Sequence, residues 1–171
     1  MRRSLPAILA AYFLLEALPA AAQRAVFVVR HAEKASDAND PGVPLSRAGR
    51  ARAIKLAALL GKAGVTAIYS TDTVRTLATA EPLARALKLQ VRKYAAKDAG
   101  GKPNPAPLAG SLKAEHADDV VLVVGHADTI PPLLKALGWA EEIEIPAGLY
   151  DDLFLVVPSG RATPTLLRLA Y

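Results

Sequence analysis

Cysteine is absent from this 171-residue sequence, and aromatic residues make up only 5% of it. The absence of cysteine excludes disulfides, thiolate nucleophiles and zinc sites built on cysteine, and it leaves the cellular compartment open. Histidine is also scarce, and no two of His31, His116 and His126 have the helical spacing of a metal-ligand pair. The sequence therefore predicts neither thiol chemistry nor a metal centre.

Concentrated charge is lacking as well. The net charge is +5, but the lysines and arginines are scattered along the chain, so the pattern does not predict a nucleic-acid surface. A mild positive field of this kind favours a small anionic substrate. Hydrophobic residues make up 52% of the sequence, which excludes a disordered chain, and the length suits one domain with a full core.

The beginning of the chain has the pattern of a signal peptide. Two arginines precede an apolar segment over residues 5–18, and three alanines predict cleavage before Gln23. The apolar segment is shorter than the roughly 20 residues that a transmembrane helix needs. We therefore expect a signal peptide over 1–22, one domain over 23–171 and a periplasmic or secreted location, with no stable membrane insertion after cleavage. An uncleaved anchor is the alternative.

Short runs of apolar and β-branched residues alternate with stretches of helical spacing along the rest of the chain. The expected strands cover residues 25–29, 65–69, 89–94, 120–124, 149–157 and 162–170. The expected helices cover residues 46–62, 71–87, 111–117 and 129–137. This alternation predicts a three-layer α/β/α sandwich with a mostly parallel sheet, and the last two strands are expected to form an antiparallel hairpin.

Two stretches depart from this regularity. Pro82 lies within the second expected helix and should break or kink it, because proline removes a helical hydrogen bond. Residues 95–110 include two adjacent glycines and three prolines and have no periodicity, which predicts a long loop.

Functional groups directly follow three of the expected strands. Arg30 and His31 end the first, the segment 70–75 follows the second, and the segment 125–129 follows the fourth. The carboxyl ends of parallel strands meet at one edge of a sheet, where helix N-termini also present free N–H groups. We therefore expect these residues to meet in one site. An arginine fork beside a histidine that titrates near neutrality suits a phosphate ester.

Four motifs, in order, resemble those of the histidine phosphatase superfamily, also called the phosphoglycerate mutase-like family. The segment 30–34 (RHAEK) resembles the family's Arg-His-Gly signature, and 45–53 resembles its first helix. The segment 69–80 resembles its second arginine motif, and 124–129 resembles its second histidine motif. The motifs agree in order and spacing over nearly all of the chain that follows residue 22.

The resemblance implies a phosphoglycerate mutase-like fold and a histidine acid phosphatase-type hydrolase that needs no metal or other cofactor. It implies that His31 attacks phosphorus as a neutral imidazole and forms a phosphohistidine, which water then hydrolyses. Arg30 and Arg75 would hold the phosphoryl oxygens of a small phosphorylated substrate, and His126 would donate to the same group. The residues expected to line the pocket and contact substrate are Glu33, Ser70 and Thr129.

The sequence departs from the family pattern at the general acid. Family members generally carry a carboxyl group in a mid-chain insertion or directly after the second histidine, where this chain has Ala127. Asp128, Glu33 and Asp98 are candidates for the acid, and none of them matches the family's position. A weak acid suits substrates with good leaving groups, including protein phosphohistidine. His116 matches no motif and is expected at the surface.

The predicted function is that of an exported phosphatase that hydrolyses a phosphomonoester or phosphoramidate. One alternative is a protein phosphohistidine phosphatase, which the signal peptide disfavours because such substrates are cytoplasmic. Another is a non-catalytic protein that binds phosphate or a polyanion in the same pocket. A mutase is disfavoured because the chain lacks the long insertion of that branch.

Overall fold

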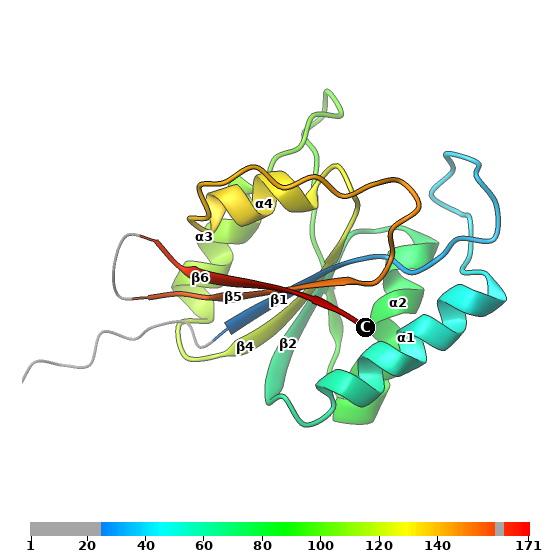
Figure 1. Ribbon diagram of the computed structural model, residues 1–171, viewed down its shortest axis with the longest axis horizontal. Coiled ribbons are helices and arrows are strands. Elements are labelled where there is room, and N and C mark those ends of the chain that lie inside the picture. Colours follow the sequence, from blue (N-terminus) through cyan, green and yellow to red (C-terminus); the bar gives the residue numbers. More distant parts are fainter. Residues whose placement is uncertain (1–24, 160–162) are drawn as a thin grey trace, which may run out of the picture.

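The computed structural model describes residues 25–159 and 163–171, so the predicted signal peptide lies outside the described residues. Strands and helices alternate along the described chain, as Figure 1 shows. The strands are β1 (Ala25–Arg30), β2 (Val65–Ser70), β3 (Val91–Lys93), β4 (Val120–Gly125), β5 (Asp152–Val157) and β6 (Thr165–Ala170). The helices are α1 (Arg47–Leu60), α2 (Val74–Leu87), α3 (Ala106–Glu115) and α4 (Ile130–Ala136).

The strands form one six-stranded mixed sheet in the order β3-β2-β4-β1-β5-β6. The pairs β2–β3, β2–β4 and β1–β4 are parallel, whereas β5 runs antiparallel to β1 and β6 antiparallel to β5. The carboxyl ends of β1, β2 and β4 therefore meet at one edge. The predicted mostly parallel sheet with an antiparallel C-terminal pair is confirmed, although residues 160–162 of the connecting turn lie outside the described residues.

Helices cover both faces of the sheet (Figure 1). Leu56 of α1 and Leu83 of α2 pack with the side chains of one sheet face, and Leu112 of α3 and Leu134 of α4 pack with those of the other. Because both faces are covered, all six residues of β4 are buried, which explains its unbroken apolar sequence. The predicted three-layer α/β/α sandwich is confirmed.

The first helix begins where its cap residue predicts. The Oγ atom of Ser46 accepts a hydrogen bond from the backbone N–H of Gly49 at 3.0 Å, which satisfies one of the free donors of the first turn of α1. The second helix begins at Val74, after a Thr73 cap, a few residues later than expected. These two starts set how the segments after β1 and β2 approach the carboxyl edge.

The expected break at Pro82 is wrong, because α2 runs without interruption through that position. Ala80, Leu83 and Ala84 are buried on either side of the proline and pack in the core, so their burial outweighs the missing helical hydrogen bond. Local propensity is overridden here by packing.

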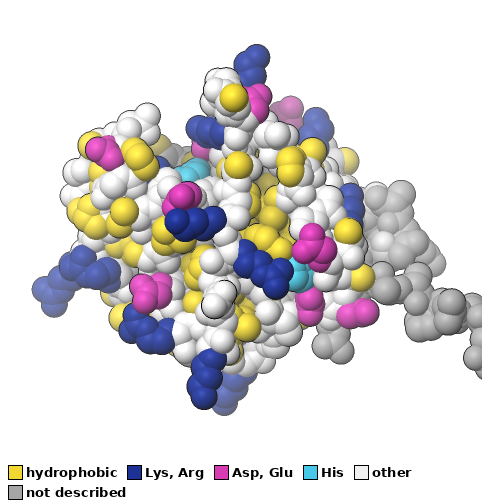
Figure 2. All heavy atoms as spheres, turned by 180° about the vertical axis from the view of Figure 1, so that it is seen from behind, with side chains coloured by type: hydrophobic (Ala, Val, Ile, Leu, Met, Phe, Trp, Pro, Cys, Tyr) yellow, Lys and Arg dark blue, Asp and Glu magenta, His cyan; other side chains and the backbone are white. Residues whose placement is uncertain are grey.

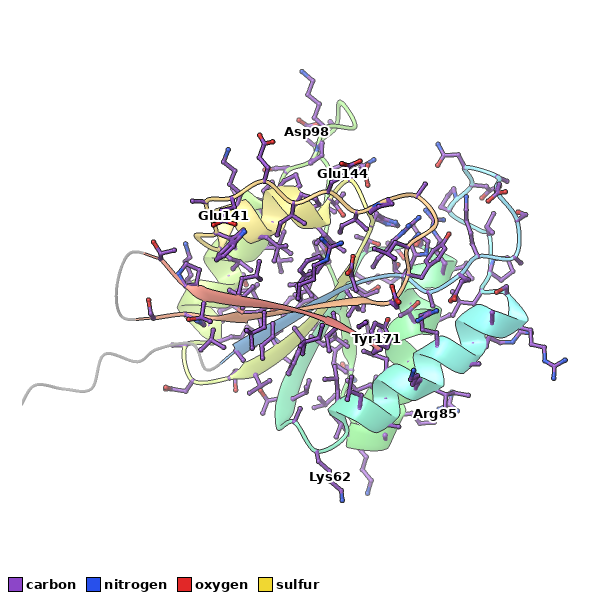
Figure 3. The ribbon with its side chains drawn as sticks, viewed as in Figure 1. Lys62, Arg85, Asp98, Glu141, Glu144 and Tyr171 are labelled. Atoms are coloured by element: carbon purple, nitrogen blue, oxygen red, sulfur yellow. The ribbon has the colours of Figure 1, made fainter. Side chains whose placement is uncertain are left out.

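The expected loop over 95–110 is shorter than predicted. Helix α3 begins at Ala106, and its two prolines, Pro105 and Pro107, stand at its cap and first turn, where proline is tolerated. The remaining loop, residues 95–105, projects from the molecule with Asp98 near its tip (Figure 3). None of the described helices is long and apolar enough to cross a membrane.

Candidate active site at the carboxyl edge of the sheet

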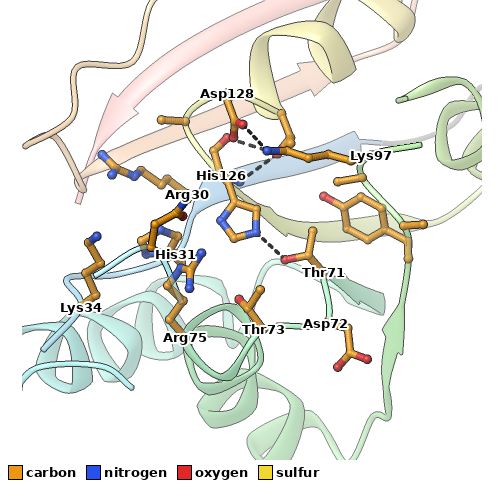
Figure 4. Close-up of a pocket in the computed structure, with 16 residues that line it drawn as sticks. Arg30, His31, Lys34, Thr71, Asp72, Thr73, Arg75, Lys97, His126 and Asp128 are labelled. Carbon is orange, nitrogen blue, oxygen red and sulfur yellow. Dashed lines mark hydrogen bonds and ion pairs between the residues drawn. The ribbon is translucent and has the colours of Figure 1, made fainter. Parts of the chain in front are cut away.

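A cavity of about 580 Å³ opens beside the carboxyl ends of β1, β2 and β4 (Figure 4). Its walls come from the segments that follow these strands and from the loop after β3. The predicted site residues that line it are Arg30, His31, Arg75, His126 and Thr129. The topology thus brings together side chains that lie almost a hundred positions apart.

Two predicted pocket residues lie outside the cavity lining. Glu33 forms an ion pair with Arg52, 2.8 Å from Oε1 to Nη2, which holds its carboxylate against α1. Burial alone would raise the pKa of Glu33, but the hydrogen bonds from Arg52 lower it overall. Ser70 is fully buried and donates to the backbone carbonyl of Thr71 at 3.0 Å. Both side chains have partners within the protein and lie outside the cavity lining, and substrate contacts of Glu33 and Ser70 stay a prediction.

His31 is held as a neutral imidazole with one defined tautomer. Its Nδ1 lies 2.8 Å from the carbonyl oxygen of Ala32, and because a carbonyl can only accept, Nδ1 carries the proton. Burial, followed by the nearby His126 and two arginines, lowers the pKa of His31 to about 3. Nε2 therefore keeps a free lone pair at neutral pH, which is the requirement for a nucleophile.

His126 lies beside His31, with the ring centroids 5.3 Å apart. Thr71 Oγ1 contacts Nε2 of His126 at 2.9 Å, so Nδ1 is the ring nitrogen left for a ligand (Figure 4). Burial and then the charge of Arg75 lower the pKa of His126 to about 4. Thr71 is itself bonded to Thr76, at 3.0 Å between hydroxyls, which ties the ring to the start of α2.

Arg30 and Arg75 line the cavity, and each has one donor without a protein partner. Arg30 Nη1 donates to three backbone carbonyls, and Arg75 Nη1 donates to the backbone carbonyl of Asp40 at 2.9 Å. The Nε atoms of both arginines are buried and lack a hydrogen-bond partner among the described residues. Two guanidinium groups beside one cavity suit an anion with several acceptor oxygens.

Both carboxyl groups that line the cavity are paired with lysines. Asp72 forms an ion pair with Lys93 at 2.7 Å. Asp128 forms one with Lys97 at 2.7 Å; burial would raise the pKa of Asp128, but the Lys97 hydrogen bond and charge lower it overall. Of the other two acid candidates, Glu33 is paired with Arg52, and Asp98 caps the turn of the projecting loop through N–H bonds from Gly100 and Lys102. The pocket therefore contains two arginine forks and two neutral histidines, but no strong proton donor.

Sequence reasoning missed several contributors. Thr71 lines the cavity as part of the segment 70–75 that was expected there, but its contact with His126 was not predicted. Lys97 also lines the cavity, and its position after β3 was the available signal. Tyr150, before β5, contacts His31 and Arg30 from outside the cavity lining, and no motif marked it.

The prediction of a surface position for His116 is wrong. His116 is buried at the end of α3, where Asp119 accepts from its Nδ1 at 2.7 Å and its Nε2 contacts the Tyr69 hydroxyl at 2.9 Å. Both ring nitrogens have partners within the protein, so His116 has a structural role at the end of α3.

Basic side chains are dispersed among acidic ones on the face shown in Figure 2, with no continuous basic patch. Several positive groups lie together around the cavity, at the carboxyl edge of the parallel strands. Fold and site together define an α/β protein with a pocket lined by paired histidines and arginines.

Comparisons with known proteins agree with this class. The family model of the histidine phosphatase superfamily (branch 1) matches residues 26–96, which contain Arg30, His31 and Arg75. No curated protein matches the chain. Over residues 26–96 the chain is similar to the histidine phosphatase superfamily, as its sequence motifs predicted.

Solved structures share the fold at low sequence identity. The protein histidine phosphatase SixA complexed with tungstate is 20% identical, with a TM-score of 0.69 over 85% of this chain and 96% of that one. A mycobacterial glucosyl-3-phosphoglycerate phosphatase complexed with inorganic phosphate is 18% identical, with a TM-score of 0.64 over 86% of this chain and 96% of that one. At these identities the likeness establishes the fold and not the substrate.

Proposed function

We propose that this protein is a phosphatase that hydrolyses a phosphomonoester or phosphoramidate through a phosphohistidine at Nε2 of His31. The observation that carries the proposal is the fixed tautomer of His31, whose free Nε2 lone pair lies beside two arginines with unpartnered donors. The two solved structures of similar fold are complexes with tungstate and with inorganic phosphate, which are oxyanions of the kind that this pocket suits.

The reaction would proceed in two displacements. Nε2 of His31 attacks phosphorus, the bond between phosphorus and the leaving oxygen or nitrogen breaks, and the arginines bind the equatorial oxygens as their charge redistributes. A water molecule then attacks phosphorus, the bond from phosphorus to Nε2 breaks, and orthophosphate leaves. The carbonyl of Ala32 holds the Nδ1 proton throughout, which stabilises the imidazole as it bears the phosphoryl group.

The pairing of both cavity carboxyl groups with lysines bears on the substrate. With Asp128 ionised by Lys97, a leaving group must depart with little help from an acid, which favours weakly basic leaving groups. The imidazole of a phosphohistidine is such a leaving group. This supports protein phosphohistidine as the second candidate substrate, and the neighbour described as a protein histidine phosphatase has the same fold.

The test compares wild-type protein with His31→Ala in the hydrolysis of p-nitrophenyl phosphate, with and without a chelator. We expect turnover in the wild type with or without the chelator, no turnover in the variant, and an unchanged fold, because His31 ends a strand that is held by its backbone pairing. A phosphoryl donor should label the wild type with an acid-labile, base-stable phosphate that the variant lacks. A label that is retained in His31→Ala and lost in His126→Ala would mean that His126, and not His31, is the nucleophile. Phosphate binding without any turnover would favour the non-catalytic alternative.

Export is a separate proposal that rests on residues 1–22. Their charge and apolar pattern supports cleavage before Gln23 and a periplasmic or secreted mature protein. N-terminal sequencing of protein recovered from a fractionated host tests it. A mature chain beginning at Gln23 outside the cytoplasm supports the proposal, and full-length protein in the cytoplasm contradicts it.

A further inference from the structure

The guanidinium of Arg30 is fixed by a segment far away in sequence. Its Nη1 donates to the backbone carbonyls of Pro146 at 3.1 Å, Ala147 at 2.6 Å and Leu149 at 2.9 Å. The next residue, Tyr150, places its ring over the same guanidinium, 4.2 Å from the central carbon to the ring centroid. The segment 146–150 therefore bonds one end of the fork and covers one of its faces.

The same tyrosine also contacts the proposed nucleophile. The rings of Tyr150 and His31 lie 5.8 Å apart at an interplanar angle of 52°. Tyr150 is not among the residues that line the cavity, so it contacts both groups from outside the lining. One side chain thus contacts both the proposed nucleophile and an arginine that lines the cavity.

The backbone carbonyls bond Arg30 at one end of its guanidinium. All three bonds end on Nη1, whereas Nε, on the other side of the planar group, has no hydrogen-bond partner among the described residues. A ring stacked on the guanidinium face adds a second restraint, because it opposes tilting of the plane by cation–π attraction and excludes water from that face. Catalysis by positioned donors is sensitive to misplacement of this kind.

We propose that Tyr150 is a positioning residue that holds the Arg30 fork and the His31 ring in the geometry that receives a phosphoryl group. Its aromatic ring provides this function, and its hydroxyl does not. The catalytic part of this inference rests on the proposed function, whereas the part concerning anion binding does not.

The test compares Tyr150→Leu and Tyr150→Phe with wild-type protein. Orthophosphate binding is measured by calorimetry, and kcat and KM are measured with p-nitrophenyl phosphate. We expect the leucine variant to bind orthophosphate about tenfold more weakly, to raise KM and to lower kcat, because a lost stack on a buried guanidinium corresponds to about one order of magnitude. The phenylalanine variant keeps the ring and should stay within about twofold of wild type.

Tyr171→Leu is the matched control. Tyr171 also stacks over an arginine, with the Arg52 central carbon 5.7 Å from its ring centroid, and it is buried outside the cavity lining. This substitution should lower the melting temperature at least as much as Tyr150→Leu while leaving orthophosphate affinity within about twofold of wild type. The imidazole NMR signals of His31 should shift in Tyr150→Leu and stay in place in Tyr171→Leu.

Each outcome decides the inference. Unchanged orthophosphate affinity in Tyr150→Leu overturns it, whatever the kinetics, and so does an equal loss of affinity in Tyr150→Phe or in the control. If the wild type binds orthophosphate but turns over no substrate, the proposed function fails, and the binding comparison still decides whether Tyr150 positions Arg30. If Tyr150→Leu does not fold, a phenylalanine variant with more than about tenfold weaker binding overturns the assignment to the ring.

Discussion

The two arginines of the pocket reach it by different routes. Arg30 ends a central strand and is fixed by carbonyls of the segment 146–149, whereas Arg75 lies in the first turn of α2 and bonds a carbonyl of the loop after β1. Each has one nitrogen bonded to the protein and a buried Nε without a partner. The geometry thus leaves part of each fork for the ligand, and that part depends on the planar shape of the guanidinium.

Replacing Arg75 with lysine should therefore weaken catalysis although the charge is kept. A lysine offers a point charge in place of the fork, and each lost charge-assisted bond corresponds to about 1.5–3 kcal/mol, so kcat/KM should fall roughly ten- to a hundredfold. Both kcat and KM should change, since the donors bind the phosphoryl group in the ground state and in the transition state.

Arg85→Lys provides the control for this measurement. Arg85 lies on the same helix, exposed and paired with Glu81, and it is not among the residues that line the cavity. It should leave kcat/KM unchanged. A loss of less than about twofold for Arg75→Lys would place Arg75 outside the working site.

At the residue scale, the sequence was informative wherever a functional side chain directly follows a strand. Arg30, His31 and His126 were predictable because strand direction alone brings them to one edge. The protein partners of Glu33 and Ser70 were not predictable, because position along the chain does not reveal which side chains are already paired. Tyr150 could not be predicted, since its role depends on a chain segment folding back over β1.

The first turn of α1 packs closely against the segment after β1 because residue 49 is a glycine and has no side chain. A Cβ added at Gly49 would lie inside the contact distance of the backbone carbonyl oxygen of Glu33, and backbone cannot yield as a flexible side chain can. Gly49→Ala should destabilise the fold by about 3 kcal/mol or more and lower activity, because the displaced segment follows His31 directly.

Gly110→Ala is the opposite case. Urea unfolding curves measure the free energy of unfolding of both glycine variants. No atom lies within 4 Å of a Cβ added at Gly110, in the interior of α3. This substitution should stabilise the protein by about 0.5–1 kcal/mol, because alanine loses less backbone entropy in a helix than glycine does. Equal effects at the two positions would contradict the close approach of α1 to the segment after β1.

At the scale of elements, the strands were predictable because a strand buried on both faces has an unbroken apolar sequence. The continuity of α2 and the start of α3 were not predicted correctly, and both involve proline. Pro82 does not end α2, and Pro105 and Pro107 precede or begin α3, because the surrounding leucines and alanines are buried. Tertiary burial is the information that a local rule about proline lacks.

For the whole molecule, the two histidines of the cavity should make stability depend on pH. Their pKa values are about 3 for His31 and about 4 for His126, compared with about 6.5 in an unfolded chain. As the pH falls below 6.5, the unfolded state binds protons that the folded state does not, so the free energy of unfolding falls until the folded histidines themselves titrate. Between pH 7 and pH 5 the loss is about 2 kcal/mol for each histidine.

Urea unfolding at pH 7 and at pH 5 checks this dependence. The variant His31→Gln cannot titrate at this position and should lose less stability over that interval than the wild type does. A double variant that also carries His126→Gln should lose still less. Equal losses in all three proteins would mean that the histidines are not held neutral by the fold.

The central position of β1 has a consequence for the order in which the molecule is made. Its neighbours in the sheet are β4 and β5, and the carbonyls that hold Arg30 lie 116 to 119 residues further along the chain. A ribosome releases the chain from its N-terminus onward, so the first strand to emerge waits for partners that are synthesised last. A nascent chain that ends before residue 120 contains the His31 signature and Arg75, but no strand with which β1 can pair. The catalytic groups of the first half therefore gain their geometry only when the last third of the chain arrives, and folding should follow completion of synthesis.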